Sequence, residues 1–303
     1  MDPASASIRR ARPLLGTFVE IGVAGAAPPD ADCAIETAFA AVARVHRLMS
    51  FHAAESEVSR LNREACDRPV AVDPWTFDVL DMALDLNRRS GGAFDIAVAP
   101  VLQALGLLPA VPGGRPFASA AASAENIELL PGCRVRFHRP GLRIDVGGIA
   151  KGFAVDRAVD ALRAHGMPCG LANAGGDLAA FGPHAETVHV RDPRDPRRLI
   201  CAIDVREEAL ATSGGRFDPF ASGDALGSAI IDPATGEPTG AILGATVRAP
   251  SCMIADALTK IVAIAGERAS ALLDEFHASA LVVLADGDIR VTRGWRDAVR
   301  LAA

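Results

Sequence analysis

The amino-acid sequence predicts an α+β fold in which mostly antiparallel sheets pack against helices. Segments with the period of a helix and short segments with the pattern of strands are mixed along the chain, without the strict strand–helix alternation of a parallel α/β fold. The chain has 303 residues, and 50% of them are hydrophobic, which is enough for a sizeable core. We expect one domain over residues 1–303, with two intertwined lobes and a site between them as the alternative arrangement.

The first half of the chain predicts a strand and two helices. Residues 15–23 have the apolar pattern of a strand, and residues 30–49 place apolar side chains at helical spacing. The pair Asp73-Pro74 is typical of an N-cap followed by the first turn of a helix, and Gly91-Gly92 is typical of its end. A strand followed by an amphipathic helix therefore opens the fold.

The second half predicts more strands, together with three helices. A glycine-rich turn leads into the first of these helices, and Asp286-Gly287 is a dipeptide typical of a tight hairpin turn. The expected helices span residues 150–165, 251–263 and 267–277. The expected strands span residues 134–137 and 142–146, which we predict to pair as a hairpin, then 187–190, 201–205 and 242–247, and a closing hairpin over 281–291.

Charge and hydropathy exclude two classes of protein. The balance of 31 basic and 37 acidic residues gives a formal net charge of −6, which argues against a protein that binds nucleic acid by neutralising phosphates. Apolar runs are far shorter than the roughly 18 to 20 residues of a membrane-spanning helix, so we expect no integral membrane segment. Residues 1–13 contain no apolar stretch typical of a secretory signal. We therefore expect a cytoplasmic protein, or a periplasmic one if a leader was removed.

Lysine is unusually rare in this chain. Of the 31 basic residues only two, Lys151 and Lys260, are lysine, which leaves 31 − 2 = 29 arginines. A chain that fills ordinary surface positions with arginine is expected to keep lysine where a compact ammonium group is needed. These two positions are therefore candidate functional residues.

The first lysine lies in a glycine-rich segment, residues 144–156. Gly147 and Gly148 stand where the expected strand gives way to the expected helix, and Lys151 falls in its first turn. Glycines let backbone groups approach a ligand closely, and the free N–H groups of a helix start favour an anion. A cation in that turn is unfavourable unless an anion lies beside it. The segment therefore indicates a phosphate or carboxylate ligand, although a plain turn with a solvent-facing lysine remains the alternative.

The second lysine lies on the helix expected over residues 251–263. Thr259 and Lys260 follow Asp256 at positions i+3 and i+4, so the three side chains share one helix face. An intrahelical ion pair explains the spacing equally well. The functional interpretation is an oxygen-rich site for a hard cation such as Mg²⁺, which often bridges to phosphates.

Eight segments, taken together and in order, resemble the ApbE family of flavin transferases. The resemblance extends over about residues 13–293. The segments are 15–17, 49–50 with 56–62, 92–100, 145–156, 173–177, 211–214, 231–236 and 255–260.

The resemblance implies an ApbE-like fold related to the T-fold, and an enzyme that moves FMN from FAD to a threonine of an acceptor flavoprotein and releases AMP. It implies Mg²⁺ at the FAD diphosphate, with Gly148 (through its carbonyl), Asp256 and Thr259 as ligands. Asp256 and Lys260 are the implied catalytic residues. The implied FAD contacts are Leu15, His52, Ala93, Phe94, Asp95, Asp145, Lys151 and Ile230.

Three positions depart from the family pattern. Ala229 stands where a histidine is usual, Lys260 where threonine is usual, and His52 where tyrosine is frequent. A missing proton-transfer group slows turnover without preventing binding, and a protonated lysine cannot ligate Mg²⁺. Two alternatives to the transferase therefore remain. One is an FAD pyrophosphatase, in which water replaces the threonine hydroxyl, and the other is a non-catalytic FAD-binding protein.

Overall fold

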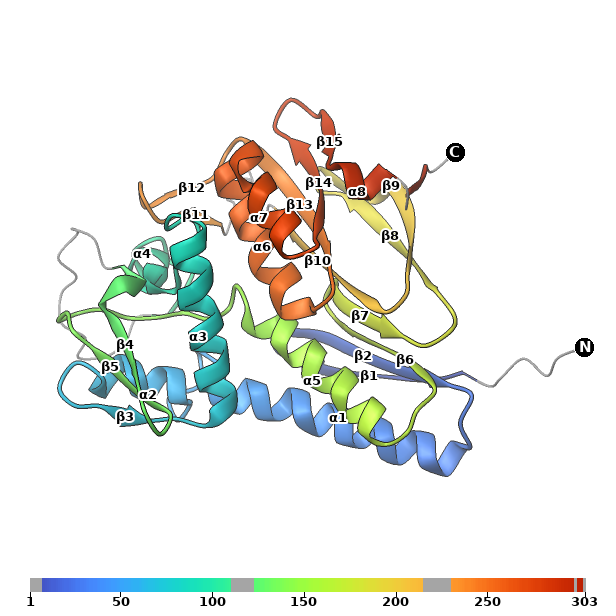
Figure 1. The fold of residues 1–303 in the computed structure, drawn as a ribbon, viewed down its shortest axis with the longest axis horizontal. Helices are drawn as coiled ribbons and strands as arrows, with labels where there is room; N and C mark the ends of the chain where they lie inside the picture. The colour runs from blue at the N-terminus through green and yellow to red at the C-terminus, as the bar shows by residue number, and fades with distance from the viewer. Residues whose placement is uncertain (1–6, 110–122, 215–229, 297–298, 302–303) are drawn as a thin grey trace, which may run out of the picture.

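An eight-stranded sheet forms the centre of the protein, which we describe from a computed structural model (Figure 1). The structure describes residues 7–109, 123–214, 230–296 and 299–301. Every neighbouring pair of strands in this sheet for which the register is defined is antiparallel. In spatial order the strands are β1 (Ile8–Leu14), β2 (Thr17–Ala24), β6 (Cys169–Ala174), β7 (Asp177–Phe181), β10 (Glu208–Gly214), β13 (Ile242–Ala249), β14 (Ser279–Leu284) and β15 (Ile289–Val291).

Both faces of this sheet are covered. Side chains alternate between the two faces along each strand, so each face packs against its own partner elements. Three helices, α1 (Pro28–Met49), α5 (Ala150–Ala164) and α6 (Cys252–Ala265), pack on one face, where Ala172 and Phe181 join the main core. On the other face Leu171 and Leu178 pack against a three-stranded sheet. Its strands are β8 (Glu186–Asp192), β9 (Asp195–Val205) and β16 (Val299–Leu301), in the order β16-β9-β8.

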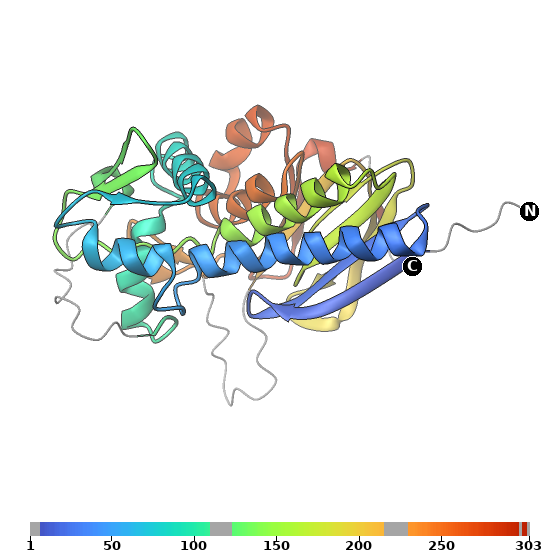
Figure 2. The same ribbon diagram turned by 90° about the horizontal axis from the view of Figure 1, so that it is seen from below.

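A smaller group of elements lies beside this sandwich (Figure 1), and the long helix α1 runs along both parts (Figure 2). Its members, all from the first half of the chain, are α2 (Glu57–Glu64), β3 (Val70–Ala71), α3 (Pro74–Arg89), η1 (Ile96–Val98), α4 (Ala99–Ala104), η2 (Ala124–Asn126), β4 (Ile127–Leu130) and β5 (Arg134–Phe137). The remaining elements are β11 (Ile231–Asp232), β12 (Glu237–Pro238), η3 (Gly266–Ala269), α7 (Ser270–Glu275) and α8 (Arg293–Arg296).

The structure confirms most of the elements expected from the sequence. Asp73 is the N-cap of α3, and its carboxylate accepts a hydrogen bond from Trp75 N at 3.0 Å. The strand expected over 15–23 begins at Thr17, because Leu15 and Gly16, with φ of 55° and 71°, form the turn that joins β1 to β2. The helix expected over 267–277 is divided between η3 and α7.

The hairpin predicted for residues 134–137 and 142–146 is wrong. Strand β5 pairs instead with β3 and β4, and residues 142–146 lie outside any helix or strand. Distant groups take the place of a partner strand. Asn62 bonds both the N–H and the carbonyl of Ile144 (2.7 and 2.9 Å), and Asp145 N donates to Ile96 O (2.8 Å). Because buried backbone groups need partners, these bonds hold the segment that leads into α5.

In the described part of the chain, no helix combines the length and the apolar character that a membrane crossing requires.

Candidate functional site

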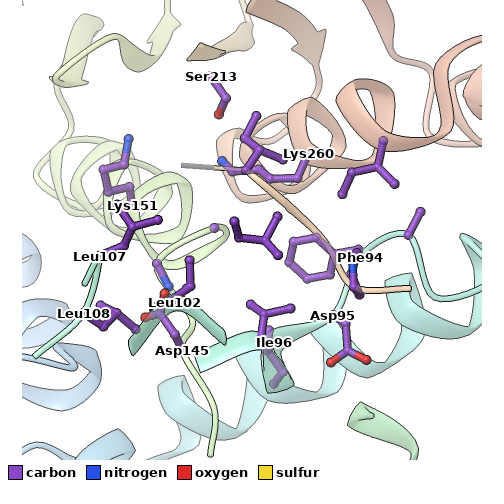
Figure 3. Close-up of a pocket in the computed structure, with 18 of the residues that line it drawn as sticks. Phe94, Asp95, Ile96, Leu102, Leu107, Leu108, Asp145, Lys151, Ser213 and Lys260 are labelled. Atoms are coloured by element: carbon purple, nitrogen blue, oxygen red, sulfur yellow. Dashed lines mark hydrogen bonds between the residues drawn. The ribbon is translucent and has the colours of Figure 1, made fainter. Parts of the chain in front are cut away.

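Lys151 and Lys260 both line one cavity of about 430 Å³. Helix α5 contributes Lys151 and helix α6 contributes Lys260, and Figure 3 shows both side chains on the same side of the space, with Ser213 of β10 near them. The rest of the lining is largely apolar, although the carboxyl group of Asp145 lies among these side chains (Figure 3). We call its labelled apolar side chains the apolar wall, and they are Phe94, Ile96, Leu102, Leu107 and Leu108.

Each lysine is paired with a buried carboxylate. Lys151 Nζ lies 2.6 Å from Asp177 Oδ2, and the side-chain exposures are 33% and 1%. Lys260 Nζ donates to Asp256 Oδ1, with exposures of 18% and 0%. Burial opposes the ammonium form of Lys151, but the charges of Asp177 and Asp256 outweigh it and raise the pKa of Lys151 above its usual value. Lys151 therefore stays an ammonium group at the cavity, and the carboxylate of Asp177 balances its charge.

Two other carboxylate contacts hold the helices that carry the lysines. Asp256 of α6 accepts a hydrogen bond through Oδ2 from Gly152 N in the first turn of α5 (3.0 Å). Asp156 of α5 in turn accepts from Ser251 Oγ, Cys252 N and Met253 N at the start of α6 (2.9, 2.8 and 2.9 Å). The free N–H groups at a helix start need such partners. Each helix therefore caps the other, and the distance between the two lysines is set by this contact.

Asp145 lies shortly before the start of α5 and lines the cavity. Burial raises the pKa of Asp145, although Gly147 N donates to it at 3.1 Å and the charges of His52 and Lys260 favour its ionised form. The folded protein thus holds the proton of Asp145 more tightly than the unfolded chain does.

This shift predicts a pH dependence of stability. The raised pKa of Asp145 contributes to the free energy of unfolding. This contribution is fully present below the ordinary pKa of 3.8 and is lost as the pH rises through the raised value. The variant Asp145→Asn keeps the acceptor for Gly147 N but does not titrate, so wild type should lose stability relative to it as the pH rises. Urea unfolding at pH values above about 4 measures this difference. Parallel curves for the two proteins would contradict it, and Asp78→Asn on the exposed face of α3 should follow wild type.

A sequence model of the ApbE family matches residues 15–284. The chain belongs to the ApbE family. This match covers most of the chain, in agreement with the segments on which the sequence-based assignment rested.

Individual ApbE relatives agree over most of their lengths. A Treponema pallidum protein named FAD:protein FMN transferase is 28% identical over 321 residues, covering 96% of this chain and 88% of that protein. A Vibrio cholerae protein of the same name is 30% identical, covering 80% and 77%. The crystal structure of an ApbE protein from Thermotoga maritima superposes with a TM-score of 0.85 at 26% identity, covering 97% of this chain and 100% of that one. The expected fold class, with mixed helices and antiparallel sheets, is confirmed.

Six of the eight expected FAD contacts line the cavity: Ala93, Phe94, Asp95, Asp145, Lys151 and Ile230. Asp95 points its carboxylate away from the space (Figure 3), because it accepts hydrogen bonds from Ala97 N and Ala124 N and so caps η1. Leu15 and His52 are not among the lining residues. Leu15 lies in the β1–β2 turn, and His52 is exposed. The FAD contacts themselves stay a prediction.

The residues expected to hold Mg²⁺ lie together but are not all open to the cavity. Gly148 lines it, whereas Asp256 and Thr259 are buried beneath Lys260 and Ser213. Among the described residues no three His, Cys, Asp or Glu side chains are grouped as metal ligands. Ala229, which replaces the usual histidine of the ApbE pattern, lies outside the described residues.

Sequence reasoning indicated the ion pair of Asp256 with Lys260 as an alternative, and the structure has it. It missed the partner of Lys151 and the group that caps α6. Asp177 ends a glycine turn that looks ordinary in the sequence, yet its carboxylate holds Lys151 and also accepts from Thr212 N at 3.2 Å. Asp156 was recognised only as part of the glycine-rich segment, and its capping of α6 depends on a contact about 95 positions away. No local pattern signals either contact.

Proposed function

We propose that this chain is an FAD:protein FMN transferase. It binds FAD in the cavity lined by Lys151 of α5 and Lys260 of α6, moves FMN to the threonine hydroxyl of an acceptor flavoprotein and releases AMP. The shared name of the relatives supports the activity. The single observation that carries it to this site is that Lys151 and Lys260, the only lysines of the chain, line one cavity together with the apolar wall.

The transfer is a displacement at phosphorus. The threonine oxygen attacks the phosphorus of the FMN half, and the bond between that phosphorus and the bridging oxygen breaks. AMP leaves with the bridging oxygen, and the hydroxyl proton passes to solvent. Such a reaction needs positioning and neutralisation of charge more than covalent chemistry by the protein. Here the ammonium groups of Lys151 and Lys260 are the donors available for that charge. The N–H groups of Ala150 and Gly152 at the start of α5 already donate to Val146 O and Asp256 Oδ2 (2.8 and 3.0 Å).

The apolar wall supplies the area that binds an aromatic ring. Phe94 is held by Asn87, whose Nδ2 donates to Phe94 O at 2.8 Å, so the backbone at this wall is fixed before a ligand arrives. Leu102, Leu107 and Leu108 extend the same surface. A pocket that combines an apolar wall with a few charged groups is typical of small-molecule sites. We assign the wall to a ring of FAD and the lysines to its diphosphate.

Mg²⁺ at the diphosphate, which the family resemblance implies, does not fit the donor groups as they stand. Asp256 uses Oδ1 for Lys260 Nζ and Oδ2 for Gly152 N. Thr259 Oγ1 donates to Asp256 O at 2.6 Å and lies 2.7 Å from Ser213 Oγ. The side-chain oxygens of Asp256 and Thr259, two of the three groups expected to bind a hard cation, are therefore already engaged within the protein. We assign no step of the reaction to a metal.

The proposal is tested by incubating the protein with FAD and a small domain that carries a threonine acceptor site, in Mg²⁺ buffer and in EDTA buffer. Mass spectrometry should find FMN covalently attached to the domain and an equal amount of AMP, with no product on a Thr→Ala acceptor. Free FMN and AMP without acceptor would instead indicate an FAD pyrophosphatase. Intact bound FAD would indicate a binding protein, and a protein that does not bind FAD would refute all three.

A further inference from the structure

We propose that the ammonium group of Lys260 takes the place of a divalent metal at the FAD diphosphate, so that FAD binds to this chain independently of Mg²⁺. The inference rests on the proposed function, since it concerns the ligand of the same cavity. It assigns to Lys260 a binding role that differs from metal coordination.

The position of Lys260 carries the first step. Its side chain lies beside Gly148 and Asp256, two of the three positions expected to bind a metal. At Gly148 a Cβ would lie 3.5 Å from Lys260 Cε, and at Asp256 both the carboxylate and the main-chain carbonyl accept from Lys260 Nζ, the latter at 3.0 Å. The Lys260 side chain therefore lies beside Gly148 and binds Asp256, two of the positions that the resemblance assigns to a cation.

The state of Asp256 carries the second step. Its side chain is fully buried, and both carboxylate oxygens have partners in the protein. A buried carboxylate needs a compensating charge, and Lys260 supplies it from the next turn of the same helix. A divalent cation would have to displace an ammonium that carries like charge and that has no lone pair with which to join the coordination sphere.

The exposure of Lys260 carries the third step. Its side chain is 18% exposed and lines the cavity, so the ammonium is not hidden by the ion pair. An ammonium group has three N–H donors. Asp256 accepts from two of them, through its carboxylate and its main-chain carbonyl, which leaves the third for an anion. Because α6 is capped by Asp156, the charge is fixed in position before FAD arrives.

A titration of FAD followed by flavin fluorescence, in EDTA and in Mg²⁺, tests the proposal on the wild-type protein. The Kd should change by less than about threefold between the two buffers, because no metal contact is lost on chelation. A loss of affinity of about tenfold or more in EDTA would overturn the proposal, because the metal would then work in spite of Lys260. Failure to bind FAD in either buffer would refute the proposed function instead.

Two variants sharpen the result. In Lys260→Thr the carboxylate of Asp256 is released and a hydroxyl is added, so FAD affinity should fall about tenfold or more in EDTA and recover in Mg²⁺. In Lys260→Met the stem is kept without charge or oxygen, so affinity should fall in both buffers with no recovery.

The metal itself provides a readout that does not depend on activity. Electron paramagnetic resonance of Mn²⁺ added with FAD should show bound metal for Lys260→Thr and none for wild type. Bound Mn²⁺ in the wild-type complex would contradict the proposal. Circular dichroism of each variant shows whether it is folded, and the wild-type experiment decides the proposal even if neither variant folds.

Discussion

Gly152→Ala should destabilise the protein by about 3 kcal/mol, the upper end of what overpacking usually costs. In an ordinary helix the same change stabilises by up to about 1 kcal/mol, so the expected sign is opposite to helix propensity. A Cβ at Gly152 would lie 2.2 Å from Cys252 O and 2.8 Å from Asp256 Cβ. The first of these atoms belongs to the backbone of α6, so the clash can be relieved only by moving one helix away from the other.

The displacement would also break the site, because α5 and α6 carry its two lysines. We therefore expect Gly152→Ala to lose both stability, measured by urea unfolding, and affinity for FAD. Gly240→Ala is the matched control, since a Cβ there meets no atom within 4 Å. A Gly152→Ala protein as stable as wild type would show that α5 and α6 are not held in the described contact.

Lys151→Met should have the second large effect, on both stability and binding. It leaves Asp177 buried without its partner, which costs about 3 kcal/mol, the low end for breaking a buried pair, because Lys151 is itself partly exposed. It also removes one of the two ammonium groups from the cavity. Affinity for FAD should fall about tenfold to a hundredfold.

A double variant separates these two consequences. Lys151→Met with Asp177→Asn buries no uncompensated charge, and the Asn oxygen can still accept from Thr212 N. Urea unfolding should therefore show most of the lost stability restored, whereas titration should show FAD affinity as low as in the single variant. Recovery of affinity in the double variant would mean that Lys151 serves only to neutralise Asp177.

Local patterns predicted the longer helices α1, α3, α5 and α6 well, but not the short helices α2 and α4. Asp73 and Ser251 cap α3 and α6 as their residue types favour, and the spacing of Asp256, Thr259 and Lys260 placed the three on one helix face, where the structure has them. These features depend on residues within one or two turns of each other. Such local interactions can therefore be predicted from the sequence.

Contacts between distant segments could not be predicted in the same way. Residues 142–146 have the composition of a strand, but Asn62 supplies the backbone partners of Ile144. Strand β1 was missed because its side chains are largely exposed and include three arginines, so it lacks the alternation of a half-buried strand. The pairing of Lys151 with Asp177 likewise depends on how α5 packs on the large sheet.

A crystal structure of the protein with FAD, from crystals grown in EDTA, is the most direct test of the proposed site. We expect the two phosphates in the cavity lined by Lys151 and Lys260, each within hydrogen-bonding reach of one of the two ammonium nitrogens. A dinucleotide seated elsewhere, or one whose phosphates turn away from both side chains toward solvent, would contradict the assignment.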